Sequence, residues 1–155
     1  MQSSPKVEWA HQCERPGFAK RPRARGTKGL GLAYERALAR AVPAQWNARH
    51  GQWYVYSSAG RVSYCQPDVL LDASLTELAV LECKLTNVEE AWEQLSKYAR
   101  VLQACHDLDI LRVVVVKSLS RCPSNAEVVE TLTQALTCAR IGRLPVLHWL
   151  GRGRL

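Results

Sequence analysis

The residues best suited to chemistry are Pro67-Asp68 and, fourteen positions after that aspartate, Glu82-Cys83-Lys84. If residues 78–85 form a strand, alternate side chains project to opposite faces, so Glu82 and Lys84 share one face. A carboxylate and an ammonium in an otherwise apolar strand are costly to bury unless they are paired. An isolated Glu-x-Lys is typical of an ion pair on a solvated sheet face, so its neighbours decide the interpretation.

Asp68 is the first of these neighbours, because it lies on the preceding strand and could stand beside Glu82. Two adjacent carboxylates are typical ligands of a hard divalent cation such as Mg²⁺ or Mn²⁺. Asp72 competes with Asp68 as a ligand, although its position before Ser74 favours a turn. The sequence therefore predicts a cation site with Asp68 and Glu82 as its carboxylates.

Three further residues join this set by position. Glu35 lies within an Ala- and Leu-rich helix before the sheet, and Gln94 and Tyr98 share a face of the helix after Lys84, since they are four residues apart. Alone, each would be an ordinary surface residue. His50 lies in an expected loop, where we predict a surface side chain.

The elements that must position these residues follow from apolar periodicity and turn signals. The chain should alternate helix, three strands, helix, strand, helix and strand. Short turns make the three consecutive strands antiparallel, and a helical crossover into the next strand makes that pairing parallel. The sequence thus predicts an α/β fold with a mixed central sheet flanked by helices. The expected helices are 30–42, one capped at Thr86 or Asn87, and 125–139; the expected strands are 53–56, 62–71 with a bend near Pro67, 78–85, 111–116 and 145–149.

Together these features resemble the PD-(D/E)xK nuclease superfamily, whose restriction-endonuclease-like core has the order αβββαβ. The motif is carried by Pro67-Asp68 and Glu82-Cys83-Lys84, and Gln94-x-x-x-Tyr98 is similar to the RecB-type branch, which includes phage exonucleases. The resemblance covers roughly residues 29–117. It implies a metal-dependent nuclease that hydrolyses phosphodiester bonds in DNA, in recombination, repair or phage DNA processing.

The resemblance also implies a role for each residue. Asp68, Glu82 and the backbone carbonyl of Cys83 would hold Mg²⁺ or Mn²⁺, and Glu35 would reach the metal directly or through water. Lys84 would position or activate the attacking water and stabilise charge on the phosphate; its two carboxylate neighbours favour the electrostatic role. Gln94 and Tyr98 would contact the substrate phosphate or support the site. Several RecB-type nucleases place a His before the Asp, a place that Glu35 takes here.

Charge is concentrated at the two ends of the chain, which has a formal net charge of +7. Residues 1–28 contain seven basic and two acidic residues, residues 140–155 contain four basic and no acidic ones, and the intervening body is slightly acidic. Basic arms on such a body favour a polyanionic partner. We expect a basic arm at 1–28, a nuclease domain at 29–150 and a basic tail at 151–155. The residues expected to contact DNA from the arm are Arg21, Arg23, Arg25 and Lys28.

The six cysteines are scattered without a CxxC pair, which favours small buried side chains in a reducing compartment over zinc or disulfides. No apolar run has the length of a membrane span or a signal peptide. We therefore expect an intracellular, cytoplasmic protein with no membrane partner, of the kind that phages and mobile elements encode.

Two alternatives stay open. A catalytically silent nucleic-acid-binding protein would need only the basic arms and loop aromatics such as Trp46 and Trp53. A homodimeric, structure-selective endonuclease such as a junction resolvase would also suit a chain of 155 residues. The sequence does not distinguish endonuclease from exonuclease or choose among single-stranded, duplex and branched DNA.

Overall fold

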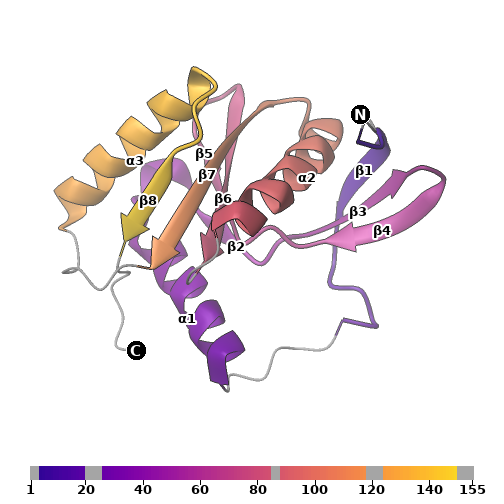
Figure 1. The fold of residues 1–155 in the computed structure, drawn as a ribbon, viewed down its shortest axis with the longest axis horizontal. Coiled ribbons are helices and arrows are strands. Elements are labelled where there is room, and N and C mark those ends of the chain that lie inside the picture. The colour runs from indigo at the N-terminus through magenta and orange to yellow at the C-terminus, as the bar shows by residue number, and fades with distance from the viewer. Residues whose placement is uncertain (1–3, 20–25, 85–87, 118–123, 150–155) are drawn as a thin grey trace.

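The computed structural model describes residues 4–19, 26–84, 88–117 and 124–149. Within them the chain forms a five-stranded mixed sheet, a separate three-stranded antiparallel sheet and three α-helices (Figure 1). The predicted α/β fold with a mixed sheet is therefore confirmed.

The five-stranded sheet has the order β2-β5-β6-β7-β8. β2, β5 and β6 pair antiparallel, whereas β6, β7 and β8 pair parallel, because the helices α2 and α3 connect the last three strands. The aliphatic run on β7 is buried on both faces, as a central strand requires. The strands are β2 (Arg49–His50), β5 (Val69–Asp72), β6 (Glu77–Lys84), β7 (Asp109–Lys117) and β8 (Val146–Trp149).

The smaller sheet has the order β1-β3-β4, with β1 at Val7–Cys13, β3 at Trp53–Ser58 and β4 at Arg61–Cys65. Ala59 and Gly60 connect β3 to β4, and both have positive φ (51° and 72°), as a tight hairpin turn with right-handed strand twist requires. The structure divides the predicted strand 62–71 in two. Pro67, which has no N–H to donate to a ladder, lies where the chain leaves β4 and enters β5 in the other sheet.

The N-terminal region also differs from the prediction of a basic arm over residues 1–28. Val7–Cys13 is a strand that pairs with β3, and α1 begins at Gly26, four residues earlier than expected. Arg21, Arg23 and Arg25 and the tail 151–155 lie outside the described residues, as does the side chain of Lys28. The expected cap of the middle helix at Thr86 or Asn87 also lies outside them.

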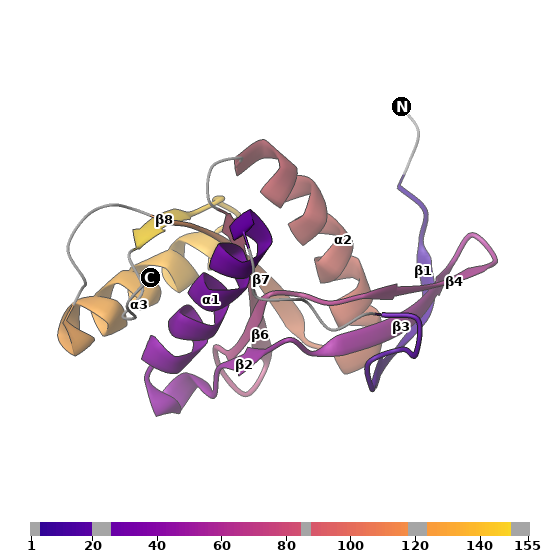
Figure 2. The ribbon, with the colours of Figure 1, turned by 90° about the horizontal axis from the view of Figure 1, so that it is seen from below.

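The helices cover the large sheet on both faces. α1 (Gly26–Ala41) and α3 (Asn125–Arg140) pack against one face of the large sheet in one apolar core. α1 is followed in the chain by a short 3-10 turn, η1 (Ala44–Trp46). α2 (Val88–His106) packs against the other face and also against the small sheet, so it lies between two sheets. Both ribbon views show the small sheet projecting on the side away from α3 (Figures 1 and 2).

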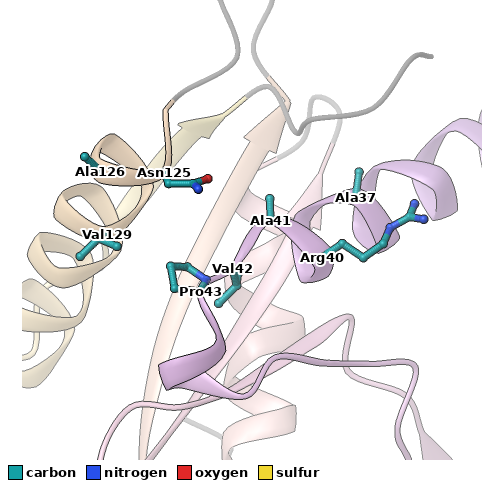
Figure 3. Close-up of a pocket in the computed structure, with 8 residues that line it drawn as sticks. All are labelled: Ala37, Arg40, Ala41, Val42, Pro43, Asn125, Ala126 and Val129. Carbon is teal, nitrogen blue, oxygen red and sulfur yellow. The ribbon is translucent and has the colours of Figure 1, made fainter.

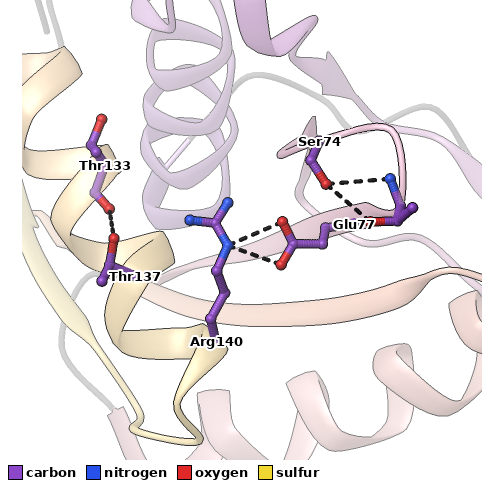
Figure 4. Close-up of polar contacts among 6 residues, drawn as sticks. Ser74, Glu77, Thr133, Thr137 and Arg140 are labelled. Carbon is purple, nitrogen blue, oxygen red and sulfur yellow. Dashed lines mark hydrogen bonds and ion pairs between the residues drawn. The ribbon is translucent and has the colours of Figure 1, made fainter.

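Polar contacts fix both ends of α3. Ser124 and Glu127 form a capping box at its first turn. At its last turn the Arg140 Nε atom donates to both carboxylate oxygens of Glu77 at 3.0 and 2.9 Å, which ties the helix to the start of β6 (Figure 4). This hydrogen bonding lowers the pKa of Glu77. In the described part of the chain, none of the helices has the length and apolarity to cross a membrane.

Candidate active site

Asp68 and Glu82 face each other at the point where β5 begins and β6 ends. Val69 pairs with Leu81 in the antiparallel register, so the preceding Asp68 stands opposite Glu82. The Asp68 Oδ2 atom accepts a hydrogen bond from the backbone N–H of Cys83 at 2.8 Å. The structure therefore brings together the two carboxylates that the sequence assigned to a metal.

Glu82 is buried, with 3% of its surface exposed. Alternation along β6 directs Leu81 and Cys83 into the core shared with α1, and Val80 into the core shared with α2. Lys84 Nζ lies 3.3 Å from Glu82 Oε1, whereas Glu82 Oε2 is buried without a hydrogen-bond partner among the described residues. A buried carboxylate oxygen with no donor is costly, so this oxygen requires either a proton shared with Asp68 or a bound cation.

The two carboxyls also shift each other's titration. Burial and, after it, the charge of Glu82 raise the pKa of Asp68 to about 9, against the lowering effect of the Cys83 N–H. Burial likewise raises the pKa of Glu82, with Lys84 opposing it. In metal-free protein the pair therefore keeps one proton between its members at neutral pH, because two adjacent buried carboxylates cannot both ionise cheaply.

Glu35 and His50 line a pocket together with Asp68. His50 Nε2 lies 3.0 Å from Glu35 Oε2, and the charge of Glu35 contributes to the raised pKa of Asp68. The prediction that His50 lies in a loop is wrong, since it belongs to the two-residue strand β2, where its partly exposed side chain lies beside Glu35. A pocket of about 180 Å³ connects the two groups; its lining includes Arg15, Glu35, Arg36, His50, Gln66 and Asp68.

The helix α2 contributes Tyr98 and Gln94. Tyr98 is buried, and its pKa is raised first by burial and then by the charges of Glu82 and Asp68. Gln94 Oε1 is buried without a hydrogen-bond partner in the described structure. Both residues therefore sit on the buried side of α2.

Asp72, the competing ligand, lies elsewhere. It ends β5 and forms an ion pair with Arg49 at 2.9 Å, and Asn47 donates a hydrogen bond to it at 3.0 Å. These contacts lower its pKa. Asp72 is therefore satisfied by its own partners, away from Glu82.

No protein-family model and no curated protein matches this chain. The site must therefore be interpreted from its own geometry.

The donor set bears on which ion could bind. In the parts of the chain that the structure describes, no group of three or more His, Cys, Asp and Glu side chains is arranged to hold a metal ion. What the site offers is a pair of carboxylates, Asp68 and Glu82, one with an unsatisfied oxygen. Oxygen donors of this kind fit a hard cation that keeps several waters, as Mg²⁺ does, better than a fully enclosed metal.

A larger cavity of about 700 Å³ lies between the end of α1 and the start of α3 (Figure 3). It shares no lining residue with the pocket at Asp68, and Arg40 is its only titratable lining residue among those described. Its walls are mostly small and apolar, from Ala37 and Ala41 to Ala126 and Val129. The larger volume therefore does not identify the candidate active site, because the ionisable side chains are concentrated around the smaller pocket.

Proposed function

We propose that this protein is a metal-dependent nuclease of the PD-(D/E)xK type that hydrolyses phosphodiester bonds in DNA. The observation that carries the proposal is the buried Asp68–Glu82 pair, with one unsatisfied oxygen on Glu82 and Lys84 at 3.3 Å from the other. A structural ion pair would need one carboxylate for Lys84, and the second carboxylate in the same buried position would only destabilise the fold.

Asp68 and Glu82, with the backbone carbonyl of Cys83, would hold Mg²⁺ or Mn²⁺. Such an ion offsets the negative charge of a phosphate and lowers the pKa of a bound water. Glu35 lies close enough to influence Asp68 and would orient water at the site, while His50 fixes the Glu35 carboxylate at 3.0 Å.

Lys84 is held in place by Glu82, with most of its side chain buried. A fixed ammonium beside the scissile phosphate stabilises the charge that develops there without reorganising water. Tyr98 and Gln94 support the carboxylates from α2, and Arg15 and Arg36 add positive charge to the pocket at Asp68. The site thus has acidic groups for a cation and basic groups for a phosphate.

The test is a cleavage assay on end-labelled linear, circular and branched DNA with Mg²⁺ or Mn²⁺. We expect Glu82→Gln and Lys84→Met each to lower the rate by a factor on the order of 100 or more, since each removes a group that acts on the transition state. Asp72→Asn is the matched control, because this acid ends the neighbouring strand β5 but pairs with Arg49, and it should retain activity.

Full activity of the Glu82→Gln protein, or cleavage in excess EDTA, would refute the proposal. DNA binding without cleavage by the intact protein would instead support the catalytically silent binding protein. The products distinguish endonuclease from exonuclease, because only an endonuclease cuts the circular substrate. Light scattering on the same samples would show whether the protein is the dimer that a junction resolvase requires.

A further inference from the structure

The small sheet has one face covered by α2 and a second face that no described helix or strand covers. The register sets which residues share this outer face. His11, Val55 and Tyr64 lie opposite one another in one row across the three strands, and Trp9, Ser57 and Val62 in the next. The other face carries Ala10, Tyr54, Tyr56 and Cys65, which pack against α2.

The outer face gathers most of the exposed large apolar side chains. Of the seven in the described residues, four are here: Trp9 is 39% exposed, Phe18 70%, Val62 59% and Tyr64 39%. The rings are already arranged in pairs. Trp9 stacks on His11 with centroids 5.5 Å apart, and Phe18 meets Tyr64 edge-on at 5.3 Å. A contiguous exposed patch of this kind marks a contact surface.

The charges at the rim favour a polyanion over another apolar surface. Lys6, Arg15 and Arg61 are exposed around the sheet. Two acids, Glu8 and Glu14, are exposed in the same region, and Glu8 accepts hydrogen bonds from Ser57 Oγ at 2.9 Å and from the Gly60 N–H at 3.2 Å. The chain as a whole carries a net charge of +7. Exposed flat rings with a basic rim are the features by which proteins bind unpaired nucleobases on a sheet surface.

The outer face is also continuous with the carboxylate site. The chain passes from Tyr64 on β4 to Asp68 in four residues, a span of at most about 13 Å for extended backbone. Arg15, two residues after β1 ends, lines the pocket that contains Asp68. A nucleic-acid strand with a phosphate at the carboxylates can therefore reach these rings with its neighbouring bases.

We propose that the outer face of the β1-β3-β4 sheet stacks unpaired bases of a single-stranded nucleic acid, with Trp9 and Tyr64 as the main platforms. The proposal rests on the proposed function, since it places single-stranded segments beside the Asp68–Glu82 site. It specifies the substrate: an unpaired strand, or the unpaired part of a branched one, in preference to a continuous duplex.

The test measures binding by the full chain in EDTA, so that metal-dependent cleavage does not occur. Fluorescence anisotropy would compare a labelled oligothymidylate with a duplex of equal length at one salt concentration. We expect the Trp9→Ala/Tyr64→Ala protein to bind the single strand at least about tenfold more weakly, because base stacking on an aromatic ring is lost at two positions. Duplex affinity, which depends on phosphate contacts, should change less than about threefold.

Leu75→Ala is the matched control, because Leu75 is almost fully exposed in the turn between β5 and β6, outside the small sheet. Tyr64→Phe keeps the ring and should bind like the wild type. If circular dichroism shows that the double variant is misfolded, Phe18→Ala replaces it, since Phe18 belongs to no helix or strand. A variant that is folded and binds the single strand as tightly as the wild type overturns the proposal.

The outcome also separates this proposal from the nuclease assignment. If the wild type cleaves DNA and the Trp9→Ala/Tyr64→Ala protein binds the single strand as tightly as the wild type, only the stacking surface is refuted. If the wild type cleaves nothing but its single-strand affinity depends on Trp9 and Tyr64, only the nuclease assignment is refuted. A wild-type dimer that becomes monomeric in the double variant would identify the face as a subunit interface and overturn the stacking proposal.

Discussion

Replacing Asp68 by asparagine should remove a pH dependence from the stability of the metal-free protein. Burial and the neighbouring Glu82 raise the folded-state pKa of Asp68 to about 9, whereas the unfolded value is near 3.8. Between these values the native state holds a proton that the unfolded state has released. The stability from this group is complete below pH 3.8 and falls as pH rises toward the folded-state value.

The size of the effect follows from linkage. One proton held only by the native state lowers the free energy of unfolding by about 1.4 kcal/mol per pH unit, so about 3 kcal/mol is lost between pH 6 and pH 8. For a domain of this size that corresponds to a fall in Tm of about 6 to 12 °C. The slope does not depend on the precise folded pKa, provided that it lies above pH 8.

Asparagine reproduces the protonated state of Asp68. Its amide oxygen can accept the Cys83 N–H, and its amide N–H can donate to Glu82, but it does not titrate. Thermal unfolding in EDTA, followed by circular dichroism at several pH values, should show a smaller pH slope for Asp68→Asn than for the wild type. Histidines and other groups titrate in both proteins, so the difference between the slopes isolates Asp68.

Asp72→Asn is the control for this experiment. Asp72 pairs with Arg49 and its pKa is lowered, so it is ionised in both states from pH 6 to pH 8 and contributes no slope there. Equal slopes for the wild type and Asp68→Asn would refute the account of a buried pair that shares a proton. Adding Mg²⁺ or Mn²⁺ should raise the Tm of the wild type at pH 8 more than that of the Asp68→Asn protein.

Two further predictions concern the fold that positions the site. Leu81→Ala, in the fully buried centre of β6, should lower the free energy of unfolding by about 3 to 5 kcal/mol in urea, through lost apolar contact and a residual cavity, whereas Leu75→Ala should change it by less than about 0.5 kcal/mol. Arg140→Ala should cost only about 0.5 to 1 kcal/mol, because its bidentate contact to Glu77 is partly exposed, and the difference from wild type should shrink in high salt and below the pKa of that acid.

A small loss for Leu81→Ala would mean that the large sheet is packed less tightly than its zero exposure indicates. A loss for Arg140→Ala well above the stated range would mean that the contact to Glu77 also fixes the position of α3. Arg143→Ala is a suitable control, since Arg143 is exposed just beyond the same helix.

The central part of the site could be predicted because it depends on local rules. Alternation along β6 was enough to place Glu82 and Lys84 on one face, and the short turn before it placed Asp68 opposite. No comparable sequence pattern indicated that His50 lies at the site. It lies on a strand of only two residues, and its position beside Glu35 depends on tertiary contacts such as the bond from the Gly51 N–H to the Asp68 carbonyl.

The strands β3 and β4 were predicted, but β1 and the separation of these strands into a second sheet were missed for a related reason. Val7–Cys13 mixes apolar and polar residues, and of that strand only Ala10 is buried, so no buried apolar stripe indicates an element. A β-bulge between Val7 and Trp9 further disturbs the alternation. The prediction of one strand over 62–71 failed because local pattern does not show that the chain changes sheets at Pro67.

The late pairing of β1 has a consequence for how the chain folds as it is made. β1 is synthesised before β3, and its partner residues on β3 lie 40 to 51 residues further along the chain. Closing so long a loop costs entropy that local hairpins such as β3–β4 do not incur. We therefore expect β1 to dock after the β3–β4 hairpin has formed, and until it does, the side of α2 that it covers stays open to water.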